Sequence, residues 1–60
     1  MYVLQNLENK YLYEFLLGEV IFCDSIQNAM VFENDFSAIT IKKRVFIQTG
    51  IDLSVQTLIK

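Results

Sequence analysis

Residues 39–50 read ITIKKRVFIQTG, and the conformation of this stretch decides the fold. It is rich in β-branched residues, which disfavour a helix and leave a strand as the alternative. Its boundaries favour a helix, because Asn34 or Asp35 is a strong N-cap candidate and Gly50 stands where a left-handed C-cap residue is wanted. We predict a helix from Asp35 to Thr49.

The apolar residues of this helix gather on one side when they are placed at 100° per residue. The predicted core side comprises Ala38, Ile39, Ile41, Val45 and Phe46. Lys42 falls inside this side, so its stem is expected to lie along the core while its ammonium group reaches water. Phe36 and Ile47 fall outside it.

Three segments before the helix have the pattern of strands. They are YVLQ (2–5), KYLYEF (10–15), which alternates with a period of two, and GEVIFCD (18–24). The polar, Asn-rich residues 6–9 between the first two are typical of a turn. We therefore expect a hairpin followed by a third strand.

Two further elements complete the expected fold. A single helical turn after Ser25 is expected to hold Ala29 and Phe32 against the sheet, and residues 51–59, IDLSVQTLI, alternate as a final strand. The prediction is one α+β domain over residues 1–60, with a small antiparallel sheet in βββαβ order and one helix packed on one face.

Length and composition indicate association. A chain of 60 residues buries little of its surface, and Cys23 is the single cysteine in a sequence without histidine, which excludes an internal disulfide and a closed zinc site. The hydrophobic content of 53% is high. We expect a homodimer.

The net charge of −2 is too mild for a DNA mimic and has the wrong sign for general nucleic-acid binding.

Enzyme chemistry has little support, so we expect a protein that is not an enzyme and uses no cofactor or metal. Without histidine the usual acid–base group at neutral pH is missing. Cys23 is expected to be an inert thiol in an apolar strand. The carboxylate pairs Glu19–Asp24 and Glu33–Asp35 are expected at solvated strand and helix ends.

Surplus apolar residues predict an interaction surface, because consecutive exposed apolar side chains mark interfaces. The candidate interface residues are Phe15, Leu16, Phe36 and Ile47. The predicted function is a non-enzymatic interaction module that docks this surface on a second copy or on a foreign protein.

A basic run gives the alternative function, a small nucleic-acid-binding accessory protein. Its candidate residues are Lys10, Lys42, Lys43 and Arg44, with Tyr11 or Tyr13 as stacking groups. Three consecutive helix positions point in three directions, however, so Lys42–Arg44 are expected to be a solvated face rather than one patch.

The expected location is the cytoplasm, in a reducing environment. The chain has one cysteine, no basic segment before an apolar run at its start, and no apolar stretch near the 18 or so residues of a membrane span. No membrane partner is expected.

The pattern of core and turn residues resembles small proteins of unknown function encoded by phages and prophages of Gram-positive bacteria. The matching elements are Lys10-Tyr11-Leu12, Val20-x-Phe22, Ala29-x-x-Phe32, Ala38 and Gly50. The resemblance spans nearly all of the chain and departs from the pattern in the β-branched helix. It implies the same fold, the cytoplasm of a host cell and a mobile-element origin, and it implies no activity.

Overall fold

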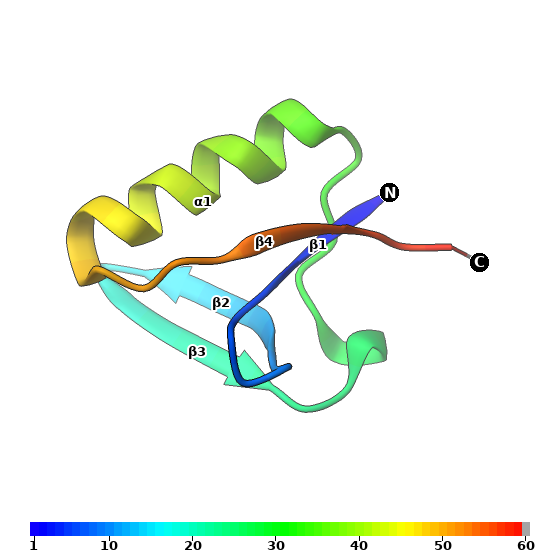
Figure 1. The fold of residues 1–60 in the computed structure, drawn as a ribbon, viewed down its shortest axis with the longest axis horizontal. Coiled ribbons are helices and arrows are strands. Elements are labelled where there is room, and N and C mark those ends of the chain that lie inside the picture. Colours follow the sequence, from blue (N-terminus) through cyan, green and yellow to red (C-terminus); the bar gives the residue numbers. More distant parts are fainter. Residues whose placement is uncertain (60) are drawn as a thin grey trace.

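The structure is a computed structural model that describes residues 1–59. Within them lie strands β1 (Tyr2–Gln5), β2 (Tyr11–Leu16) and β3 (Glu19–Cys23), a 3-10 turn η1 (Ile26–Asn28), helix α1 (Asp35–Thr49) and strand β4 (Ser54–Thr57). Figure 1 shows α1 lying along one side of the strands. The predicted α+β class and βββαβ order are confirmed.

Helix α1 begins and ends where its capping residues predict. The Asn34 side chain accepts a hydrogen bond of 2.8 Å from the Ser37 backbone N–H. At the other end Gly50 has a φ of 77°, and its N–H donates to the Phe46 carbonyl over 2.8 Å. These local bonds, with the burial of Ala38 and Val45, outweigh the strand preference of the β-branched residues.

The strands form one antiparallel sheet in the order β3-β2-β1-β4. β4 is shorter than the strand predicted over residues 51–59. Its partner β1 has four residues, and the register pairs Tyr2 with Thr57 and Gln5 with Ser54, so the paired stretch of β4 is as long as β1. One further bond, 2.7 Å from the Leu58 N–H to the Met1 carbonyl, follows it. Ile59, the last residue of the predicted strand, lies outside β4 and is 85% exposed. The longer strand was a wrong prediction.

Strand β2 contains a β-bulge between Leu12 and Glu14. The extra residue brings Leu12 and Phe15 to the same face of the hairpin, opposite Phe22 and Val20 of β3. The uninterrupted alternation predicted for residues 10–15 was therefore wrong. The apolar pattern of a strand does not show where a bulge adds an extra residue.

The core lies between α1 and the sheet. Its fully or almost fully buried members are Leu4, Leu12, Phe32, Ala38, Val45 and Leu53. The turn η1 is capped by Ser25, and it is followed by Ala29 and Phe32, each 8% exposed. The predicted single turn and its two buried residues are confirmed.

The predicted core side of α1 was too wide. Ala38 and Val45 are buried and Ile41 is half-buried, but Ile39 is 39% and Phe46 is 53% exposed. A helix that rests on one sheet buries a stripe of about 100°, and a wider arc needs a second covering element. Residues 1–59 supply no such element next to Phe46.

Candidate interaction surface

The side of α1 that points away from the sheet carries large apolar residues. Phe36 is 76% and Ile47 is 80% exposed. They are eleven positions apart, three helical turns, so they lie on the same side and about 16 Å apart along the axis. Thr40 and Lys43 occupy the positions between them. We call these four residues the outer helix face.

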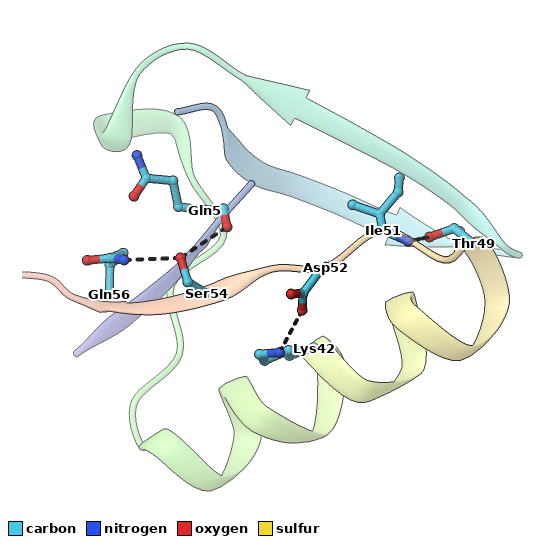
Figure 2. A network of polar contacts seen from close by, with 7 residues as sticks. All are labelled: Gln5, Lys42, Thr49, Ile51, Asp52, Ser54 and Gln56. Carbon is cyan, nitrogen blue, oxygen red and sulfur yellow. Dashed lines mark hydrogen bonds and ion pairs between the residues drawn. The ribbon is translucent and has the colours of Figure 1, made fainter. Parts of the chain in front are cut away.

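One flank of this face is joined to the segment between α1 and β4 by polar contacts. Lys42 Nζ donates to Asp52 Oδ1 over 3.1 Å, as Figure 2 shows, and the Ile51 N–H donates to Thr49 Oγ1 over 3.1 Å. The Thr49 hydroxyl in turn donates to the Val45 carbonyl over 2.7 Å. The segment that leaves α1 is thereby held against the end of the helix. Lys42 is half-buried, with a side chain that is 33% exposed, as expected for a lysine within the predicted core side.

Lys43 and Arg44 have no carboxylate partner among residues 1–59, whose ion pairs are Lys10–Asp24 and Lys42–Asp52. Lys43 lines a hollow with Phe46, Ile47 and the Lys42–Asp52 pair. Arg44 lies on the other flank of the outer helix face. The outer helix face therefore combines two apolar ends with one cation that has no carboxylate partner among the described residues, Lys43, and a second such cation, Arg44, lies on its flank.

The tip of the β2–β3 hairpin forms a second apolar surface. Leu16 is 61% and Leu17 is 95% exposed. Leu17 and Gly18 form the two-residue connection, with φ values of 53° and 80°. A left-handed conformation costs an L-residue with a side chain roughly 1–2 kcal/mol. Leu17 thus combines a strained backbone with a large apolar side chain that is almost fully exposed.

The two apolar surfaces meet at Arg44. One groove is lined by Phe15–Gly18, Ile41, Arg44 and Gln48. A neighbouring groove is lined by Phe36, Ser37, Thr40, Ile41 and Arg44. The Arg44 side chain thus lines both grooves. It connects the hairpin tip with Leu16 to the first turns of α1 with Phe36.

Three of the four candidate interface residues are exposed in this region, namely Leu16, Phe36 and Ile47. Phe15 is half-buried and packs against the core cluster, on the opposite side of β2 from Leu16. Sequence reasoning missed Phe46, which it assigned to the core, and it left Leu17 out of the candidate interface residues. The exposure of Leu17 could have been predicted from the sequence, because Gly18 follows it between two predicted strands and glycine is typical of two-residue hairpin turns.

The four candidate nucleic-acid-binding residues do not form one patch. Lys10 Nζ lies 3.1 Å from Asp24 Oδ1, and Lys42 is paired with Asp52. Lys10 belongs to a groove with the β1–β2 turn and Phe22, whereas Arg44 faces the hairpin tip. Lys43 and Arg44 alone remain available to an anion among the described residues.

Groups that could carry catalysis are dispersed. The half-buried Cys23 thiol donates to the Ser25 carbonyl over 3.3 Å. Within residues 1–59 no three Cys, Asp or Glu side chains gather as metal ligands would. The same residues contain no helix with the length and apolar character of a membrane span.

Comparison of the chain with models of protein families, with curated proteins and with solved structures found no match.

Proposed function

We propose that this chain is a non-enzymatic protein-interaction module of phage or prophage origin that docks the outer helix face on a host or phage protein. The origin is supported by the sequence pattern described above. The docking is supported by one observation above all: Phe36 and Ile47 are more than three-quarters exposed on the same side of α1. Large apolar side chains grouped in this way on a soluble surface mark an interaction site.

The charges on this surface indicate the chemistry of the partner. Lys43 and Arg44 are uncompensated among residues 1–59, whereas the chain as a whole has a net charge of −2. A partner that presents apolar groups about 16 Å apart, with carboxylates between them, would satisfy both features. Binding would act by occlusion, because the module covers a surface of its partner without chemical change.

The proposal is tested by capture of proteins from a Gram-positive host lysate with three forms of the immobilised chain. These are the wild type, the Phe36→Ser/Ile47→Ser variant and a matched control, Leu7→Ser, which removes an apolar side chain that is 90% exposed in the β1–β2 turn. We expect a protein that the wild type and the control retain after nuclease treatment and that the helix variant loses. Equal retention by all three forms would contradict the proposal.

A second candidate, binding of single-stranded nucleic acid, is favoured by Lys43 and Arg44, which have no carboxylate partner among residues 1–59, near the exposed Phe36 ring, since aromatic and basic groups together hold such strands. Lys10 and Lys42 support it less, because each already has a carboxylate partner. Salt separates the two functions: phosphate binding weakens steeply as salt rises, and apolar docking does not. Loss of all captured material on nuclease treatment would select the second candidate.

A further inference from the structure

Strand β3 forms one border of the sheet, and its outer edge is open. The sheet order ends at β3, which pairs with β2 on its inner side. In both Figure 1 and Figure 2, no other described segment runs along its outer side. Edge strands of monomeric proteins usually carry lysine, proline or another protection against pairing. β3 carries no lysine or proline, its one charge is at its first residue, Glu19, and Ile21 in the middle of the strand is 45% exposed.

The direction of the free hydrogen-bonding groups follows from one backbone bond. The Met30 N–H donates to the Leu12 carbonyl over 2.8 Å, so this carbonyl points away from β3. Leu12 lies opposite Phe22. Because the Leu12 carbonyl points away from Phe22, these two residues form a non-hydrogen-bonded pair of the antiparallel ladder. The N–H and C=O of Phe22 thus point toward the open edge. With the period of two of a strand, those of Val20 do so as well.

We propose that β3 pairs antiparallel with β3 of a second copy of this chain, about a two-fold axis at Ile21. In this register Val20 lies opposite Phe22 of the second copy, and the two pairs exchange four backbone hydrogen bonds. Ile21 lies opposite Ile21 of the second copy, on the side of the sheet away from α1. Glu19 lies opposite Cys23, so no like charges are placed directly against each other.

A second copy fits this edge because the edge is self-complementary. A two-fold interface needs a surface that matches itself, and the free groups of β3 are arranged symmetrically on either side of Ile21. The pairing also closes the assembly at two chains. Each copy would then end in β4, a strand of four residues in which Ser54, Gln56 and Thr57 are exposed and polar.

The register is tested by disulfide formation in a variant with one thiol, Ile21→Cys/Cys23→Ser. Residues opposite each other in a non-hydrogen-bonded pair have Cα atoms about 4.5 Å apart, which is within the range of a disulfide. In the wild type the two Cys23 residues would be offset by four positions, about 14 Å along the strands, and so would not react. Serine at position 23 keeps a donor for the Ser25 carbonyl.

The matched control is Leu7→Cys/Cys23→Ser, whose thiol replaces a side chain that is 90% exposed in the β1–β2 turn. On non-reducing gels after mild oxidation, the Ile21→Cys variant should form the covalent dimer at least about tenfold faster than this control, and wild type should form little. A rate no greater than that of the control would overturn the register.

Sedimentation equilibrium tests the association itself. Five paired residues bury less than the ~800 Å² per partner of a standard interface, so we expect a concentration-dependent dimer between roughly 1 µM and 1 mM. The wild type should approach twice its 7.0 kDa mass. Ile21→Lys places two ammonium groups at the axis and should stay monomeric, with an unchanged circular dichroism spectrum. A wild type that remains monomeric throughout, or equal association of the Lys variant, would overturn the proposal.

Discussion

Tyr2 and Phe32 exchange two backbone hydrogen bonds, each 2.8 Å long between nitrogen and oxygen. The Met30 N–H bonds to Leu12 of β2 over the same distance. β1 and β2 are paired next to the turn that connects them, at Gln5 and Tyr11. Residues 30–32 therefore lie between the separating ends of β1 and β2, and they carry the Phe32 ring into the core.

Phe32→Ala should be among the most damaging substitutions in this chain. The ring is 8% exposed in the core cluster, and truncation of a buried phenylalanine costs about 3–5 kcal/mol. A domain of this size has a total stability of only about 3–9 kcal/mol. We expect a largely unfolded variant by circular dichroism and chemical denaturation. Val31→Ala, at a position that is 45% exposed, is the control; equal losses at the two positions would contradict the packing described here.

Leu17→Asn should stabilise the protein. The φ of 53° at Leu17 strains a leucine, whereas asparagine followed by glycine is the preferred pair in a turn with two positive φ values. Little packing is lost, because the side chain is 95% exposed. We expect a gain of about 0.5–1 kcal/mol, measured as a rise of several degrees in Tm. Leu16→Asn, outside the turn, should bring no gain, and a fall in Tm for Leu17→Asn would show that the side chain has a structural role.

Asn34→Ala should weaken the start of α1. The substitution removes the acceptor of the 2.8 Å bond from the Ser37 N–H, at a cost of about 1 kcal/mol. Asn34→Asp keeps an acceptor and adds a negative charge at the positive end of the helix dipole, so it should retain wild-type stability. Urea denaturation of the three proteins measures the difference. The cap would be unimportant if the alanine and aspartate variants unfolded at the same urea concentration.

Gly50→Ala should destabilise the end of α1 through the backbone alone. No atom lies within 4 Å of the position that the new Cβ would take, but the φ of 77° is unfavourable for alanine. The expected loss is about 1 kcal/mol in thermal or urea denaturation. Gly50→Asn should lose less, because asparagine tolerates this conformation better. A larger loss for asparagine than for alanine would point to crowding rather than to backbone conformation.

Predictions about the candidate site were correct where the spacing of residues within one helix decides which side chains are exposed. They were wrong where contacts with another segment decide it. Phe36 and Ile47 could be placed outside the core from helical spacing, and both are exposed. Phe15 packs against the core because the bulge in β2 changes which side of the strand it occupies. The partner of Lys10 is Asp24, fourteen positions along the chain, and no spacing rule connects them.

The sequence by itself determined the ends of α1, the β1–β2 turn and the order of the elements. Those features depend on bonds within about four residues, such as Asn34 to Ser37, or Asn6 Oδ1 accepting from the Lys10 N–H. The tertiary structure alone decided how wide a side of α1 is buried, where β4 ends and how residues 30–32 enter the sheet. Each of these depends on a surface supplied by a distant segment, because burial and strand register are properties of a pair of elements and not of either one.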